Sequence, residues 1–315
     1  MSVSATAAPE SVVRFEDAHV LFRSRVRAPV WALRGLTLAV PRGAVMGLLG
    51  PNGAGKTTSI SCVLGLLEPQ AGAAYVWGEP VIGARATPER RAGALLEDTR
   101  LPPFLSVASA LRLVCALRGV DAKKEVERAT SLCHIGELHG RTVSTLSKGQ
   151  ARKVGLAAAL LGDPPLLILD EPSAGLDAEA RVDFDALVRS LNDGRRTLLI
   201  ASHLLGDVEA TCTHIAVMQE GRVVLSGRSS ELLAQARQGQ ASEVHVDASA
   251  SGLLTQRGID SAPSRYPGLV LLKSALTDEE LFATLASLRV APRRVEPKVS
   301  VLSVYLSATR GEGTP

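Results

Sequence analysis

The chain has 315 residues, 46% of them hydrophobic, which is enough for one large domain with its own core and a second, smaller one. Its formal net charge of +3, with basic and acidic residues interspersed, does not indicate a nucleic-acid partner. The four cysteines lie far apart and form no CxxC pair, so we expect neither a zinc site nor a disulfide framework, and a reducing compartment fits.

Targeting and membrane signals are absent from the sequence. The first residues, MSVSATAAPES, lack the charged and apolar regions of a signal peptide. The longest apolar runs, such as VGLAAALLG at 154–162, are much shorter than a membrane span. We therefore expect a chain that is not exported and does not cross a membrane by itself.

The sequence predicts strands followed by helices in the first half of the chain. Short β-branched and apolar runs broken by turn signals predict a small antiparallel β unit within 11–49, whose last run, AVMGLL at 44–49, leads into a Gly-rich turn. A helix over KTTSISCVLGLL, 56–67, follows. Helical periodicity then continues over about 98–162, which predicts an inserted helical subdomain.

The second half begins with a βαβ pattern. The apolar runs PLLILDEP (165–172) and RTLLIASH (196–203) are typical of buried parallel strands, and the stretch 179–193 between them is typical of a crossover helix. A hairpin is predicted over 214–227, and a polar linker helix follows it. We place a domain boundary near 238–243, between a main domain over 11–238 and a small α/β extension over 243–310.

The segment GPNGAGKTT satisfies the phosphate-loop pattern G-x-x-x-x-G-K-[ST] between a strand and a helix, where that pattern requires it. Backbone amides of such a loop turn toward phosphates, the lysine reaches the β and γ oxygens, and the following hydroxyl suits Mg²⁺. The candidate nucleotide ligands are Gly50, Pro51, Asn52, Gly53, Ala54, Gly55, Lys56, Thr57 and Thr58.

Polar residues follow the two predicted parallel strands. Asp170 and Glu171 end the first strand, and His203 ends the second, so all three lie at the edge where open parallel sheets bind ligands. Asp170 suits the coordination environment of Mg²⁺, and Glu171 is placed to polarise an attacking water. Alone, each of these residues would more often be an ordinary surface residue.

The stretch STLSKGQARK, 144–153, contains a capping box, because Ser147 and Gln150 have the S-x-x-Q spacing at the start of a predicted helix. A helix N-terminus with a hydroxyl and a glycine amide provides half of an anion site. Ser147 can serve only to cap its own helix, or it can also contact a phosphate, and the two roles can coexist.

Taken together, these motifs resemble the ATP-binding cassette (ABC) ATPases over roughly 11–235. They occur in that family's order: GPNGAGKTT as Walker A, ALLED at the Q-loop position, LSKGQ as signature, LLILDEP as Walker B, SAGLD as D-loop, and SH with the switch histidine. The resemblance implies an α/β fold with a P-loop NTPase core, in which a mainly parallel sheet is flanked by an antiparallel β unit and carries an inserted helical subdomain.

The resemblance also implies ATP and Mg²⁺ as cofactors and a dimer in which the Walker A of one subunit faces the signature of the other. Lys56, Thr57 and Thr58 would hold phosphates and metal, Glu171 would act as the base, and His203 would contact the γ-phosphate. The other subunit would meet Ser147, Lys148, Gly149, Gln150 and the D-loop residue Asp177.

The sequence departs from the family pattern in three places. Glu97 occupies the Q-loop position where glutamine is usual, and a carboxylate there can still meet Mg²⁺. Lys148 replaces a glycine of LSGGQ, and it either adds a favourable charge near bound phosphates or faces solvent. Phe22 fits the position of the aromatic residue that stacks on adenine, with Trp31 as the alternative.

The tail, from GRVVLSGRSSELLAQ (221–235) to VEPKVSVLSVYLSAT (295–309), is similar to the ATPase subunits of bacterial drug and polysaccharide-type exporters. This implies a separate integral membrane permease docking near 97–120, a second ATPase subunit identical to the first, and a place on the cytoplasmic face of the plasma (inner) membrane. The alternatives are a soluble cassette acting on ribosomes or DNA, and a half of a heterodimer that binds ATP without hydrolysis.

Overall fold

The computed structural model describes residues 11–23, 28–82, 92–204, 208, 211–232, 243–273 and 278–296. The chain divides into two compact units, Met1–Arg228 and Ser229–Pro315. The boundary predicted from the sequence, 238–243, falls almost wholly outside the described residues. It stays a prediction.

The first unit contains an antiparallel sheet in the order β2-β1-β4-β5. Its strands are β1 (Ser11–Phe22), β2 (Val30–Pro41), β4 (Ala71–Val76) and β5 (Glu79–Pro80). Buried and exposed residues alternate over 36–40 of β2, as in strands with one solvated face, whereas β1 is less regular and its register with β2 shifts. The hydrogen bond from the Arg34 amide to Gly221 O, 2.9 Å, links this sheet to the next one.

The second sheet has six strands in the order β10-β9-β3-β8-β7-β6. All neighbours pair in parallel except β9 and β10, which form the hairpin predicted over 214–227. The strands are β3 (Val45–Leu49), β6 (Ala92–Leu95), β7 (Leu166–Asp170), β8 (Thr197–Ser202), β9 (His214–Gln219) and β10 (Arg222–Arg228). Every residue of β3, β7 and β8 is buried, which explains their continuous apolar sequences.

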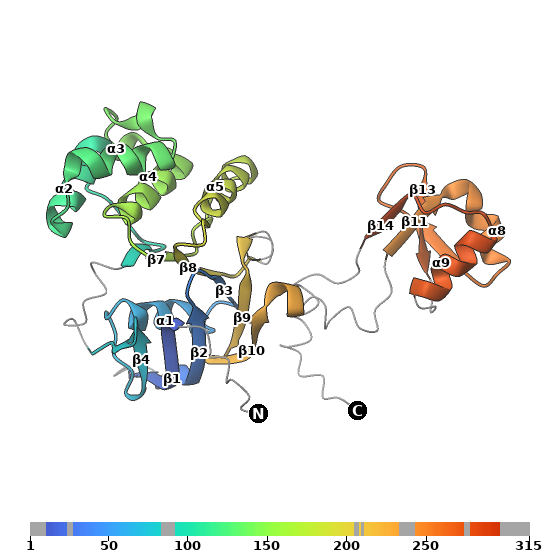
Figure 1. Ribbon diagram of the computed structural model, residues 1–315, viewed down its shortest axis with the longest axis horizontal. Coiled ribbons are helices and arrows are strands. Elements are labelled where there is room, and N and C mark those ends of the chain that lie inside the picture. The colour runs from blue at the N-terminus through green and yellow to red at the C-terminus, as the bar shows by residue number, and fades with distance from the viewer. Residues whose placement is uncertain are drawn as a thin grey trace, which may run out of the picture. The chain divides into compact units, whose positions relative to one another are not determined.

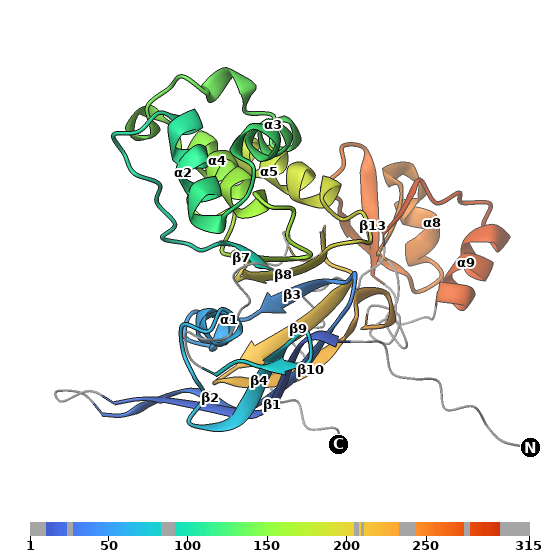
Figure 2. The same cartoon turned by 60° about the vertical axis from the view of Figure 1, so that its left-hand side comes forward.

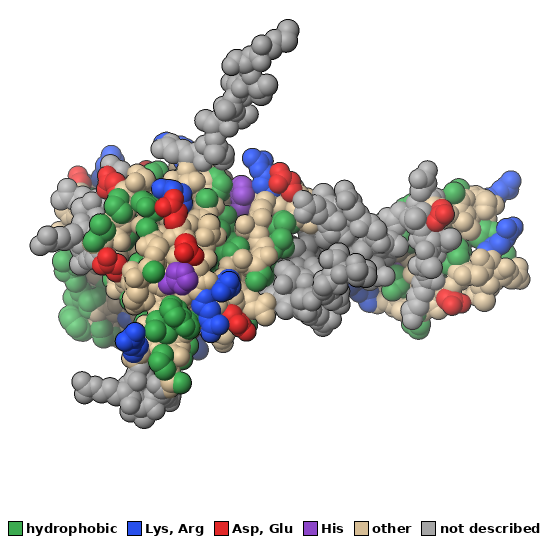
Figure 3. Space-filling view, turned by 90° about the horizontal axis from the view of Figure 1, so that it is seen from below, with side chains coloured by type: hydrophobic (Ala, Val, Ile, Leu, Met, Phe, Trp, Pro, Cys, Tyr) green, Lys and Arg blue, Asp and Glu red, His purple; other side chains and the backbone are tan. Residues whose placement is uncertain are grey.

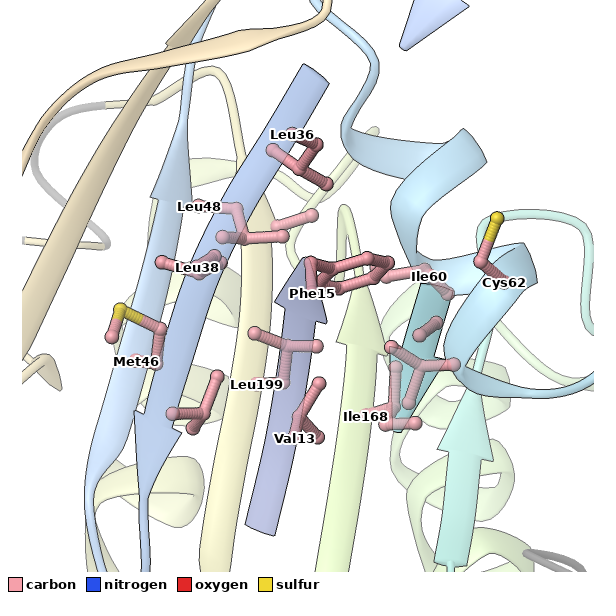
Figure 4. Close-up of a cluster of buried hydrophobic side chains, with 14 of the residues drawn as sticks. Val13, Phe15, Leu36, Leu38, Met46, Leu48, Ile60, Cys62, Ile168 and Leu199 are labelled. Atoms are coloured by element: carbon pink, nitrogen blue, oxygen red, sulfur yellow. The ribbon is translucent and has the colours of Figure 1, made fainter. Parts of the chain in front are cut away.

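The core of this unit fills the space between the two sheets (Figure 4). Phe15 and Leu36, from the antiparallel sheet, pack with Leu48 and Ile168, from the parallel one, and Ile60 of the helix α1 (Lys56–Val63) joins them. The cluster fixes where β3 ends and where α1 begins. The loop between those two elements is therefore held at both ends by packing.

Helices α2 (Val107–Arg118), α3 (Ala122–Leu132) and α4 (Lys148–Leu160) lie together on the β7 side of the unit, away from β1, β2 and β4 (Figures 1 and 2). The short 3₁₀ turns η3 (Gly136–Leu138) and η4 (Val143–Thr145) connect α3 to α4, and α5 (Ala178–Ser190) links β7 to β8. All but α5 fall within 98–162, the range of the predicted helical subdomain. Among the described residues, no helix has the length and the apolar character that crossing a membrane requires.

Glycines let α4 approach the edge strand β6 closely. A Cβ atom on Gly93 would lie 1.9 Å from the carbonyl oxygen of Ala159, and one on Gly155 would lie 2.8 Å from Leu95 Cδ1. Neither position has room for a larger side chain without movement of its neighbour. The helix that starts at the signature is thus packed directly on the strand that leads to Glu97.

The second unit contains a four-stranded antiparallel sheet in the order β12-β13-β11-β14. Its elements are β11 (Glu243–Asp247), η5 (Ala248–Ala250), α8 (Ser251–Thr255), β12 (Asp260–Pro263), β13 (Leu269–Lys273), α9 (Asp278–Ser287) and β14 (Arg294–Glu296). This βαββαβ order is the ferredoxin-like arrangement, built on its own core around Val244, Val246 and Leu281. The closing segment 297–309 lies outside the described residues.

Candidate active site

The phosphate loop joins the end of β3 to the start of α1. Gly53 (φ 82°) and Gly55 (φ 103°) take backbone conformations that other residues rarely adopt. Gly55 is the N-cap of α1, and within the described chain no side chain caps the first amides of this helix. Those amides are therefore available to an anion, as in other helix N-terminal phosphate sites.

A cavity of about 240 Å³ opens beside this loop. Side chains from β2, from the Q-loop position and from the end of β7 line it together with the loop; they are Val30, Trp31, Ala32, Asn52, Gly53, Ala54, Gly55, Lys56, Thr57, Thr58, Glu97 and Glu171. Trp31 belongs to this lining, whereas Phe22 does not. The cavity brings together most of the loop and acidic residues that the sequence selected.

Lys56 is buried at the base of the cavity, with 6% of its side chain exposed. Its Nζ atom donates hydrogen bonds to the carbonyl oxygens of Gly50 (2.7 Å) and Pro51 (3.2 Å) and lies 3.6 Å from Glu171 Oε1. The ammonium group thus lies between the loop and the end of β7. Phosphate oxygens entering the cavity would meet a cation already held at this point.

Glu171 is in contact with His203. The Nδ1 atom of His203 lies 2.7 Å from Glu171 Oε2, and the two residues follow adjacent strands, β7 and β8. Glu171 has φ 46°, an uncommon value for a residue with a side chain, and its amide donates to Ala201 O at 2.9 Å. This backbone turn carries the carboxylate out of line with the strand, so that Lys56 and His203 face its two oxygens. Glu171 and Lys56 line the cavity, whereas His203 does not belong to its lining.

Asp170 is buried, with only 1% of its surface exposed. The pKa of this carboxyl is raised, mainly by burial and also by the charges of Glu171 and Glu97. The hydrogen bond from Thr57 and the charge of Lys56 act in the opposite direction. Its Oδ1 atom has no hydrogen-bond partner among the described residues. A buried carboxylate oxygen without a partner, next to a hydroxyl, fits a divalent cation.

The acidic groups here do not form a complete metal cage. Among the described residues, no group of three or more His, Cys, Asp or Glu side chains is placed to hold a metal. Mg²⁺ is usually bound through one or two carboxylates together with waters and substrate phosphates, so a full protein cage is not needed. Thr57, Asp170 and Glu97 therefore fit Mg²⁺ that arrives with a nucleotide.

The signature residues form the N-terminus of α4. Ser147 Oγ accepts the Gln150 amide at 3.2 Å, and Gln150 Oε1 accepts the Ser147 amide at 3.1 Å, which confirms the predicted capping box. Lys148 is exposed, and its Nζ atom lies 3.9 Å from the place of a Cβ on Gly175 in the D-loop segment. Asp177 caps α5 by accepting the Ala180 amide at 2.9 Å. Ser147 to Gln150 and Asp177 do not belong to the lining of the cavity described above.

One residue of the site was missed by the sequence reasoning. Arg152 of α4 donates hydrogen bonds to Leu96 O (3.0 Å) and to Glu171 O (3.3 Å). It lies in the positively charged stretch STLSKGQARK, but the sequence does not tell which of the three cations turns inward. Only the packing of α4 on β6 selects Arg152.

Comparison with known proteins agrees with the resemblance to the ABC ATPases that the motifs indicated. The family model described as ABC transporter matches residues 33–174. An uncharacterized ABC transporter ATP-binding protein of Nostoc sp. is 35% identical over 230 residues, covering 71% of this chain and 68% of the relative. This chain belongs to the ABC transporter ATP-binding proteins. The Nod factor export ATP-binding protein I of Cupriavidus metallidurans is 36% identical over 201 residues, covering 63% of this chain and 66% of that protein.

Solved structures of ABC cassettes have the same fold. The protein cbiO1 of Clostridium perfringens, part of the ABC transporter complex cbiONQ, aligns with a TM-score of 0.64 and 28% identity over 72% of this chain and 92% of that one. A dimeric ATP-binding cassette in a post-hydrolysis state, bound to ADP and Pi, aligns with a TM-score of 0.62 and 20% identity over 69% of this chain and 98% of that one, a likeness of fold alone. The predicted P-loop NTPase fold of an ABC ATPase is confirmed, and this ABC transporter ATP-binding subunit has the ATPase activity of its family.

Proposed function

We propose that this ABC ATP-binding subunit drives an exporter, by closing with a second subunit around ATP and hydrolysing it at Glu171. The observation that carries the catalytic part of the proposal is the pair of contacts on one carboxylate. Glu171 Oε2 lies 2.7 Å from His203 Nδ1, and Oε1 lies 3.6 Å from Lys56 Nζ. A base held on both sides at the mouth of a phosphate loop is what activation of a water at the γ-phosphate requires.

The chemistry follows from these positions. The loop amides and Lys56 bind the phosphates, so the ammonium exchanges part of its contact with Glu171 for phosphate oxygens. Glu171 is then free to accept a proton from the attacking water, while His203 keeps the carboxylate oriented. Thr57, Asp170 and Glu97 would hold Mg²⁺, which neutralises phosphate charge when bound.

The dimer is proposed because half of the anion site is missing from the cavity. Ser147 and Lys148 are exposed at the N-terminus of α4, which is the positive end of that helix. A second copy of this chain would bring these residues onto the phosphates held by the first copy. We therefore propose a homodimer with two ATP molecules at its interface, in which Asp177 also reaches the partner.

The proposed direction of transport rests on the relatives, and the proposed membrane partner rests on exposed apolar residues in α2 and in the segment before it. One relative is named as an export ATP-binding protein. Between 97 and 120, Phe104 (78% exposed) and Leu117 (80% exposed) present apolar side chains to solvent. An integral membrane permease docking here would place the subunit on the cytoplasmic face of the plasma membrane. On the face shown in Figure 3, positive and negative side chains are intermixed, which gives no support to a nucleic-acid partner.

Co-expression with the membrane protein encoded beside this chain tests the proposal. We expect the two to co-purify from membranes, and ATP turnover to require Glu171. Replacing Phe104 and Leu117 with Ser should weaken co-purification without lowering the ATPase rate of the isolated subunit. The matched control is Leu253→Ser, which changes an exposed apolar residue of the second unit. Co-purification with ribosomes or DNA in place of a membrane protein would contradict it.

A further inference from the structure

Arg152 joins three parts of the site that are far apart in the sequence. It lies on α4, two residues after the signature residue Gln150, and it is half-buried. Its Nη1 atom donates to Leu96 O at 3.0 Å, and its Nη2 atom donates to Glu171 O at 3.3 Å. One guanidinium group therefore connects the signature helix, the residue before Glu97 and the catalytic carboxylate's own backbone.

The carbonyl that Arg152 holds belongs to a strained residue. Glu171 has φ 46°, and a residue with a side chain keeps such a left-handed conformation only where its surroundings fix it. Three hydrogen bonds fix this one in the structure. The Glu171 amide donates to Ala201 O, and the Glu171 carbonyl accepts from the Ala174 amide at 3.1 Å and from Arg152. The first two come from the strand end and its turn, and the third ties the Glu171 backbone to α4.

Three carboxylates surround the Arg152 guanidinium. Burial lowers its pKa overall, and the charges of Glu97, Asp170 and Asp98 act in the opposite direction. Arginine remains protonated under all ordinary conditions, so the group is a fixed cation among these acids. Its planar fork can reach two carbonyl oxygens at once, whereas the single ammonium of a lysine cannot reproduce that geometry.

We propose that Arg152 is a positioning residue that ties the orientation of Glu171 to the position of the signature helix. When Ser147 engages a phosphate on the partner subunit, any movement of α4 is transmitted through Arg152 to the Glu171 backbone and to the Glu97 segment. Hydrolysis is thereby linked to closure within each chain. This inference rests on the proposed function, since it assumes that Glu171 is the base.

The test compares Arg152→Met and Arg152→Lys in the full chain with Lys153→Met as the matched control. Lys153 is the next residue on α4 and pairs with Asp183 of α5 at 3.6 Å. We expect kcat of Arg152→Met to fall roughly 10- to 100-fold, because sub-ångström to 1 Å misplacement of a catalytic group has effects of this order. KM, the Kd for ATP and the thermal midpoint should stay close to wild type. Arg152→Lys should remain impaired, and Lys153→Met should hydrolyse normally.

The substitution Glu97→Gln distinguishes two possible roles of Arg152, which are bridging two carbonyl oxygens and neutralising the charge of Glu97. If Arg152 acts by bridging two carbonyls, the double variant Glu97→Gln/Arg152→Met stays as slow as Arg152→Met. Recovery of kcat in the double variant would overturn the proposal, because it would mean that Arg152 only neutralises Glu97. Wild-type kcat in Arg152→Met, or a joint loss of ATP binding and thermal stability in both Arg152 variants, would also overturn it. A wild-type chain without turnover would instead overturn the proposed function, and this inference with it.

Discussion

The Nδ1 atom of His203 lies 2.7 Å from Oε2 of Glu171, across the ends of two neighbouring parallel strands. The parallel register of β7 and β8 places residues that are 32 positions apart in the sequence within hydrogen-bonding distance. The contact orients a carboxylate whose other oxygen faces Lys56. Catalysis at this site should therefore depend on His203 even though the histidine is not the base.

Replacing His203 with Ala should lower kcat about 100-fold or more, in the range of a lost acid–base or orienting contact. Because the His203 side chain is 42% exposed, the fold should tolerate the change. ATPase rates and a thermal melt measured on the same preparation check both statements. A His203→Ala variant that hydrolyses ATP at the wild-type rate would show that the contact with Glu171 has no catalytic role.

Trp31, rather than Phe22, should stack on adenine. Trp31 lines the cavity of the phosphate loop, and its ring contacts His19 edge-on with the ring centroids 5.9 Å apart. Base stacking on an aromatic ring contributes about 1–3 kcal/mol, so Trp31→Ala should weaken ATP binding at least ~5-fold. Phe22→Ala is the matched control and should bind normally. Titration with a fluorescent ATP analogue distinguishes the two, and the opposite ranking would restore Phe22.

Gly55 and Gly53 should respond differently to Ala. Both have positive φ, but a Cβ on Gly55 would lie 2.5 Å from Ala32 O, whereas among the described residues no atom lies within 4 Å of a Cβ on Gly53. Gly53→Ala should cost about 1–2 kcal/mol of backbone strain, and Gly55→Ala about 2–5 kcal/mol because a clash is added. Thermal unfolding compares them. Equal stability of the two variants would contradict this account of the loop.

Most of the fold could be predicted from the sequence, because its signals are local. Fully buried strands give continuous apolar runs, and the Ser147–Gln150 capping box is a fixed spacing that needs no tertiary information. The ferredoxin-like order of the second unit was not predicted, because short strands and helices do not specify which strands pair. Arg152 was missed for a similar reason, since its role depends on how closely α4 approaches β6.

Lys148 is the residue at which the signature of this chain, LSKGQ, differs from LSGGQ. Its side chain is exposed, and its Nζ atom lies 3.9 Å from the place of a Cβ on Gly175 in its own chain. If its charge favours closure, Lys148→Gly should reduce ATP-driven dimerisation in a Glu171→Gln background, by roughly the 0.3–1 kcal/mol typical of an exposed charge near a helix end. Light scattering at several ATP concentrations measures the shift. An unchanged dimerisation curve would leave Lys148 as a solvated side chain without a role in closure.

The most direct test of the central claim is the molar mass of the Glu171→Gln variant with and without ATP and Mg²⁺, measured by size-exclusion chromatography with light scattering. We expect a monomer without nucleotide and a stable dimer with ATP, accompanied by very low turnover. Adding Lys56→Ala should abolish the dimer, because Lys56 is placed to hold the phosphates. A Glu171→Gln variant that stays monomeric in ATP and hydrolyses it at the wild-type rate would contradict both the proposed dimer and the role of Glu171 as the base.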